Sequence, residues 1–149
     1  MYAKILIPTD GSDLADQAVT KGLELARTLG AEVVILTVVE PFHVVAYGVA
    51  GDAHQLQSNM RAYEAQTGAH ANQVLEAAGA RAAEAGVPVS TRQIQSDQPA
   101  EAIVRAAEEA GADLIVMASH GRRGVAALVL GSQTTRVLTH TKIPVLVLR

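Results

Sequence analysis

The sequence contains no cysteine and no tryptophan, and it has a single phenylalanine among its 149 residues. The absence of cysteine excludes disulfides, thiolate catalysis and cysteine-based zinc sites. Aromatic residues make up only 3% of the chain, too few for the stacking platform that binds single-stranded nucleic acid. The hydrophobic content is nevertheless 49%, so the core must be built from Val, Leu, Ile and Ala.

The sequence also lacks an excess of positive charge, since its formal net charge is −3. It therefore offers no global attraction to nucleic acid or to an anionic membrane. No uncharged apolar run approaches the roughly 20 residues that cross a bilayer, and the first residues lead directly into an expected strand, without a signal peptide. The histidines show no metal-ligand spacing, so we expect no metal site. We expect a cytoplasmic protein that binds neither nucleic acid nor membranes.

Apolar strands and alanine-rich helices alternate along the chain. Five strands and four helices in alternation predict one open doubly wound α/β domain over residues 1–149, with a parallel sheet and helices on both faces. The segment at 42–57 has no sustained period and is expected to form a long loop. The expected strands are 5–7, 31–39, 87–95, 114–117 and 144–148, and the expected helices are 13–29, 56–85, 99–110 and 132–140.

A glycine-punctuated, doubly basic stretch follows the fourth expected strand. It reads ASHGRRG at 118–124 and GSQTT at 131–135, and Ser132 is expected to cap the short helix that begins there. Backbone N–H groups freed by glycine, together with the positive end of a helix dipole, form an anion site. Arg122 and Arg123 add charge to it. The pattern therefore predicts a phosphate-binding loop.

The spacing of this stretch is specific. Gly121 is followed by nine residues and then by Gly131 and Ser132, which resembles the G-x2-G-x9-G-[S/T] motif of nucleotide-binding universal stress proteins. Ala118 stands where that motif has its first glycine. The sequences ILIPTDGS at 5–12 and IPVLV at 143–147 also resemble the first and last strands of this family. The resemblance covers essentially the whole chain and implies a Rossmann-like, adenine-nucleotide α-hydrolase-like fold with strand order 3-2-1-4-5.

The resemblance further implies a site for ATP or another adenine nucleotide, with or without Mg²⁺. In such sheets ligands bind where the strand order reverses, here between the first and fourth strands. Asp10 can cap the following helix as well as accept a hydrogen bond from nucleotide, and Val38 and Met117 suit a core role equally well. The expected binding residues are Pro8, Thr9, Asp10, Val38, Met117, Ala118, Gly121, Arg122, Arg123, Gly131, Ser132 and Gln133.

Two functions remain open. The favoured one is a regulatory, stress-response module that binds ATP and hydrolyses it slowly at most. The sequence has no G-x4-G-K-[S/T] loop, and no nucleophile and base can be assigned together, not even around His120, so we expect no catalytic residues. The alternative is a member of the same family that binds no nucleotide and acts only through protein–protein contacts with unknown partners. The methyl group of Ala118, which would obstruct a closely approaching nucleotide, favours this alternative.

The last expected strand suggests how the chain assembles. Residues 144–148 are apolar on both faces, yet the expected strand order puts them at the edge of the sheet. An exposed apolar edge is a liability that proteins cover or use. Pairing with its own copy about a two-fold axis would cover this edge. We therefore expect a homodimer that forms through residues 144–148, as is common in the resembling family.

Overall fold

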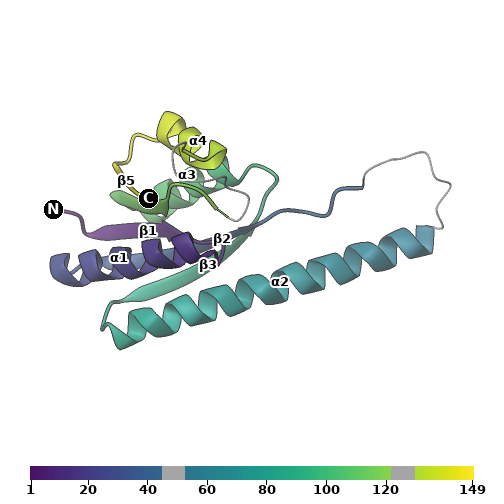
Figure 1. Cartoon of the computed structure of the whole chain (residues 1–149), viewed down its shortest axis with the longest axis horizontal. Helices are drawn as coiled ribbons and strands as arrows, with labels where there is room; N and C mark the ends of the chain where they lie inside the picture. Colours follow the sequence, from purple (N-terminus) through teal and green to yellow (C-terminus); the bar gives the residue numbers. More distant parts are fainter. Residues whose placement is uncertain (45–52, 122–129) are drawn as a thin grey trace.

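The computed structural model of the chain describes residues 1–44, 53–121 and 130–149. Strands and helices alternate in it, as the sequence predicted (Figure 1). The elements are β1 (Lys4–Pro8), α1 (Asp13–Leu29), β2 (Glu32–Val39), α2 (Ala53–Glu84), β3 (Val89–Gln95), α3 (Pro99–Ala110), β4 (Leu114–Ala118), α4 (Ser132–His140) and β5 (Val145–Leu148).

All five strands lie in one parallel sheet with the order β3-β2-β1-β4-β5. Ile5 of β1 is in register with Val33 of β2 on one side and with Leu114 of β4 on the other. The expected strand order is confirmed. Because the order reverses between β1 and β4, the carboxyl ends of these two strands mark the place where such sheets bind ligands.

Side chains alternate between two separate apolar layers along each central strand. In β1, Ile5 and Ile7 face one layer and Leu6 faces the other. The first layer is covered by buried residues of α1 and α2, and the second by residues of α3 and α4. Both faces of the central sheet are therefore buried, which explains why β1, β2 and β4 are largely continuous apolar runs rather than alternating ones, unlike the edge strand β3.

Helix α1 is well defined at both ends and packs closely on the sheet. Ser12 is its N-cap residue, and the Ser12 Oγ accepts a hydrogen bond from the Ala15 N–H at 3.4 Å. Gly30 ends it in the left-handed conformation, with φ of 67°. Gly22 faces β1 so closely that a Cβ atom there would collide with Ile7 Cδ1. The packing of α1 therefore fixes the position of the β1–α1 turn.

Helix α2 begins earlier than the sequence predicted. It starts at Ala53, inside the segment expected to be a loop, because its first turns contain no helix breaker. Its buried residues lie between Ala71 and Ala82, whereas residues 53–62 are all exposed, and this part projects beyond the sheet (Figure 1). Tyr63 packs against Phe42 with the two rings tilted by 57° and their centroids 5.4 Å apart. Residues 45–52 of the expected loop lie outside the described residues.

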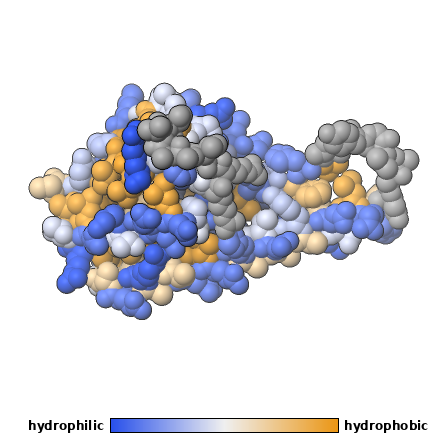
Figure 2. All heavy atoms as spheres, in the orientation of Figure 1, coloured by the Kyte–Doolittle hydropathy of each residue, from blue (hydrophilic) through white to orange (hydrophobic). Residues whose placement is uncertain are grey.

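On the face shown in Figure 2, apolar side chains are exposed among polar ones near β5 and along the projecting part of α2. Leu146, in the edge strand β5, is 41% exposed. Leu56 and Met60 are exposed on the amino-terminal half of α2. Within the described residues, no helix combines the length and the apolar character that crossing a membrane requires.

Candidate functional site

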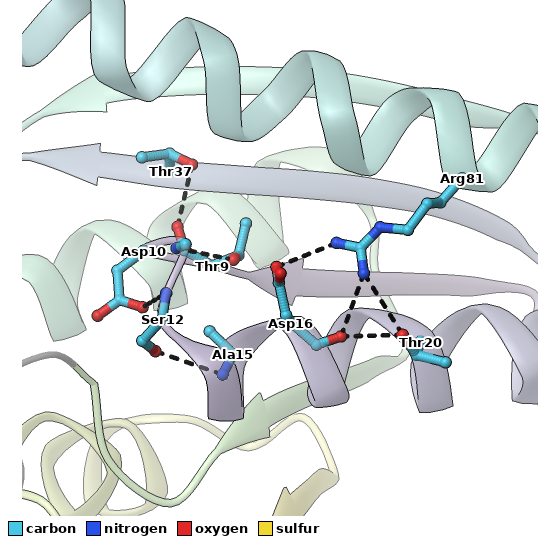
Figure 3. Close-up of polar contacts among 9 residues, drawn as sticks. Thr9, Asp10, Ser12, Ala15, Asp16, Thr20, Thr37 and Arg81 are labelled. Carbon is cyan, nitrogen blue, oxygen red and sulfur yellow. Dashed lines mark hydrogen bonds and ion pairs between the residues drawn. The ribbon is translucent and has the colours of Figure 1, made fainter.

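The turn after β1 is held in place by buried hydroxyl groups. The Thr9 N–H donates to the Leu36 carbonyl at 2.8 Å, and the Thr37 Oγ1 donates to the Thr9 carbonyl at 3.0 Å (Figure 3). The Gly11 N–H in turn donates to the Thr9 Oγ1 at 3.2 Å. Thr9 and Thr37 are both buried. These bonds between β1 and β2 tie the turn to the carboxyl end of the sheet, with Pro8 as the last residue of β1.

Asp10 shapes the turn with one carboxylate oxygen and reaches the β4 side with the other. Its Oδ1 accepts a hydrogen bond from the Ser12 N–H at 3.0 Å, while Ser12 caps α1 (Figure 3). A Cβ atom at Gly121 would lie 2.5 Å from the Asp10 Oδ2. Asp10 and Gly121, which are expected members of the same site, therefore adjoin each other in the folded chain.

The end of β4 carries a second set of anchored residues. Ala118 is the last residue of the strand and is only 8% exposed. The Ser119 N–H donates to the Leu148 carbonyl at 2.7 Å, and the Ser119 Oγ hydrogen-bonds the His120 Nδ1 at 3.2 Å. The latter bond joins two adjacent residues of the loop.

Helix α4 begins beside this loop and spans Ser132–His140, as the sequence predicted, but its cap residue differs from the prediction. Gly131, not Ser132, is the N-cap residue, and Ser132 is the first helical residue. The cause is the Gly131 N–H, which donates to the Ser119 carbonyl at 2.8 Å and holds Gly131 in an extended conformation with φ of −60°. Any residue can adopt that φ. A Cβ atom at 131, however, would lie 3.0 Å from the Ser119 oxygen and 3.2 Å from the His120 Cα.

Gln133 and Thr134 connect the first turn of α4 to its surroundings. The Gln133 Oε1 accepts a hydrogen bond from the Ala100 N–H at 3.1 Å, so its side chain is directed to α3. The Thr134 Oγ1 lies 3.1 Å from the Ala118 carbonyl oxygen and 3.0 Å from that of Ser119. Thr134 was not among the expected binding residues; the hydroxyl-rich first turn of α4 was the feature of the sequence that could have indicated it.

The expected binding residues fall into three groups: those at the carboxyl edge of the sheet, those in the core, and those outside the described residues. The first group lies in the turn after β1, at the end of β4 and at the start of α4. Met117 is 5% exposed and belongs to the second apolar layer, against which the half-buried Val38 also packs. Arg122 and Arg123 lie outside the described residues. We call the region bounded by residues 8–10, 118–121 and 131–133 the crevice.

The crevice provides hydrogen-bond donors for an anion. The first N–H groups of an α-helix have no acceptor within that helix, and the helix dipole makes this end positive. In α4 these groups include the N–H of Ser132 and of Gln133, and the Ser132 side chain is exposed. No group of three His, Asp or Glu side chains that would suit a metal ion is present among residues 1–44, 53–121 and 130–149.

A parallel, doubly wound sheet with a helix amino terminus at its reversal point defines a Rossmann-like α/β domain. A family model, that of the universal stress protein family, matches residues 1–149. The chain belongs to the universal stress protein family, and its architecture is adenine-nucleotide α-hydrolase-like.

Individual relatives agree with this assignment over their full lengths or nearly so. Universal stress protein MJ0531 of Methanocaldococcus jannaschii is 35% identical over 149 residues, which cover 100% of this chain and 83% of the relative. The structure of UspA from Lactobacillus plantarum superposes with a TM-score of 0.82 at 27% identity, covering 99% and 98% of the two chains. A universal stress protein solved in complex with cAMP gives a TM-score of 0.72 at 27% identity, covering 99% and 97%.

Proposed function

We propose that the chain binds an adenine nucleotide, ATP or a relative of it, in the crevice. The observation that carries the proposal is the close packing of Gly131 against the backbone of Ser119 and His120, which a Cβ atom at 131 would approach to within 3.0 Å and 3.2 Å. Glycine at this position brings the start of α4 against the end of β4 and leaves helix N–H groups at the reversal point of the sheet. The relative solved with cAMP, an adenine nucleotide, supports the proposal.

The residues present fit the parts of such a ligand. The first turn of α4, with the Ser132 hydroxyl and the N–H groups of Ser132 and Gln133, suits phosphate oxygens. Thr9 and Asp10, held by the turn after β1, suit the base and ribose. Val38 borders the adenine end and offers apolar contact. Mg²⁺, if it accompanies the nucleotide, would be held chiefly by the phosphates, as is usual for this ion.

The biological role follows from what the crevice contains. In its described part, the hydroxyl that contacts a histidine, Ser119 Oγ beside His120 Nδ1, belongs to a residue that is only 5% exposed. A buried hydroxyl is poorly placed to attack a nucleotide, so turnover should fall far below the common enzyme kcat of about 10 s⁻¹. A nucleotide that is bound and hardly consumed serves as a signal, and we infer a regulatory, stress-response module of one domain, residues 1–149. We further infer that this module acts as a homodimer.

Ala118 gives a specific reason to keep a second candidate function. If its methyl group prevents close approach of the nucleotide, the chain would be a family member that acts through protein contacts alone. Alanine fits the strand conformation of this position, and Ala118 is mostly buried in β4. A modest methyl clash costs about 1–3 kcal/mol, which weakens binding without abolishing it. We therefore favour nucleotide binding.

Isothermal titration with ATP and Mg²⁺ tests the proposal. The unmodified protein should bind, and Gly131→Ala should bind at least about fivefold more weakly, because the added methyl must displace the Ser119 and His120 backbone. Gly68→Ala is the matched control, since the nearest atom to a Cβ there is 3.9 Å away, in the flexible Gln93 side chain. An unmodified protein that shows no binding at millimolar ATP would overturn the proposal. A phosphate-release assay with turnover at ordinary enzyme rates would contradict the regulatory role.

A further inference from the structure

Two neighbouring side chains at the start of α4 are directed away from each other, into the surrounding fold. Gln133 is exposed as a residue, yet its Oε1 accepts the Ala100 N–H of α3. Thr134 is 2% exposed, and its hydroxyl lies within hydrogen-bond distance of two carbonyl oxygens at the end of β4. The same turn of helix is thus attached to an element on each side.

The contact made by Gln133 compensates for a missing cap. Gln98 is the N-cap residue of α3, and its own side chain makes no capping hydrogen bond in the described part of the chain. The Ala100 N–H is one of the first donors of α3 and would otherwise lack a protein acceptor. Gln133, which lies 33 positions further along, supplies one. The amino termini of α3 and α4 are therefore joined by a bond that orients α4.

The contact made by Thr134 sets the distance between α4 and β4. Its hydroxyl donates to the carbonyl groups that end the strand, and the Ser119 carbonyl also accepts the Gly131 N–H at 2.8 Å. Two donors from consecutive parts of the same turn thus converge on Ser119. Thr134 is buried, and its hydroxyl proton is donated to backbone carbonyl groups, so Thr134 can contribute to the crevice only by positioning the first turn of α4.

We propose that Gln133, through its side chain, and Thr134 are positioning residues that aim the free N–H groups of α4 at the nucleotide phosphates. This inference rests on the proposed function and deepens it, because it assigns phosphate affinity to side chains that are directed at α3 and β4. Adenosine lacks the phosphates, so its affinity should not depend on either residue. The ratio of ATP affinity to adenosine affinity therefore measures the positioning.

The experiment compares Thr134→Val and Gln133→Met, which keep the approximate size and remove the polar contact, with Thr139→Val. Thr139 is a suitable control because the described partners of its hydroxyl all belong to its own helix: the Thr135 and Arg136 carbonyls and the His140 Nδ1. Loss of the side-chain hydrogen bond of either Gln133 or Thr134 should lower ATP affinity about tenfold. Adenosine affinity should stay within about twofold, and the control should change neither.

The outcomes separate the two claims. If the unmodified protein binds neither ATP nor adenosine, the proposed function fails, and the phosphate-positioning role fails with it. If it binds both but Thr134→Val and Gln133→Met leave the ratio unchanged, or lower both affinities equally, only the positioning role is overturned. Amide hydrogen exchange of Gly131 provides a check without nucleotide: exchange should accelerate in Thr134→Val, and unchanged exchange would contradict a positioning role for Thr134.

Discussion

The carboxylate of Asp10 occupies the space in which a side chain at Gly121 would begin: a Cβ atom at 121 would be 2.5 Å from the Asp10 Oδ2. The two residues are separated by more than a hundred positions and follow the two strands, β1 and β4, between which the sheet order reverses. Glycine at 121 therefore leaves room for the present position of the Asp10 carboxylate, which a side chain at 121 would displace.

The first prediction concerns this pair. Gly121→Ala should displace the Asp10 carboxylate and weaken ATP binding, because the added carbon cannot coexist with the present position of the Asp10 Oδ2. The displacement should cost about 1–3 kcal/mol, a loss of roughly fivefold or more in affinity. Isothermal titration would measure it. The double variant Gly121→Ala with Asp10→Ala should lose little beyond Asp10→Ala alone, and additive losses would contradict the steric account.

The second prediction concerns Ala118. Ala118→Gly should tighten ATP binding, because it removes the methyl group at the site of close approach. It should also lower the melting temperature, since glycine within a strand costs roughly 0.5–1 kcal/mol relative to alanine. Tighter ATP binding and a lower melting temperature are opposite changes, so the gain in affinity could not be a result of a more stable fold. Titration calorimetry and a thermal melt without ligand measure them separately, and unchanged affinity would show that the methyl is no obstacle.

The third prediction concerns the free edge of the sheet. The carbonyl group of Pro144 accepts the N–H of Ile115 in β4 at 2.9 Å, and that of Leu148 accepts the N–H of Ser119, just after β4, at 2.7 Å. Backbone groups alternate along a strand, so the N–H of Val147 is directed away from β4. Val147→Pro should therefore remove a donor at the free edge and spare the β4 ladder, and it should convert the proposed homodimer to monomer in light scattering.

Val147→Thr serves as the control for this experiment. It keeps the N–H and the branched shape, and it should remain a dimer. A monomeric unmodified protein, or a Val147→Pro variant that stays dimeric, would show that residues 144–148 are not the interface.

The fourth prediction concerns Asp113, which joins the start of β1 to the start of β4. Its Oδ2 accepts the Ala3 N–H at 2.8 Å and its Oδ1 accepts the Lys4 N–H at 3.0 Å. The hydrogen bond from Ala3, chiefly, lowers the pKa of Asp113, against an opposing effect of burial. A lowered pKa in the folded state stabilises the fold above the unfolded-state pKa, and this stability disappears as the pH falls through the folded-state value.

Asp113→Asn should therefore lower the free energy of unfolding at pH 7, by about 1 kcal/mol for a weakened hydrogen bond. The difference from the unmodified protein should begin to shrink as the pH falls below about 4, the ordinary pKa of an aspartate in an unfolded chain, and should disappear as the pH falls through the lower folded-state pKa. Urea unfolding at both pH values measures it. The exposed Asp97, changed to Asn, provides the comparison. A constant difference at every pH would mean that the charge of Asp113 is not responsible.

The sheet was predictable because its signals are local. The run Leu114–Ala118 is apolar without alternation, which only a strand buried on both faces requires, and the structure buries all of it. The start of α4 at Ser132 was predicted, but its cap residue was not, because Gly131 is held by a hydrogen bond from its N–H to the Ser119 carbonyl, twelve residues earlier. The contact between Gln133 and Ala100 has no local signature at all. Bonds between distant segments, which decide how the crevice is shaped, follow from the packed fold and not from spacing.

The projecting part of α2 has a practical consequence. Tyr63 donates a hydrogen bond to the Glu40 carbonyl at 3.2 Å, just beyond β2, so helix and strand are coupled there. Ten residues separate Tyr63 from Ala53, about 15 Å of helix, and a rotation of about 5° at Tyr63 would move the tip by roughly 1 Å. Because the sequence contains no cysteine, Met60→Cys would introduce a single thiol on the projecting part of α2. A fluorophore or spin label attached there would report, at a distance, what a ligand does to the carboxyl end of β2.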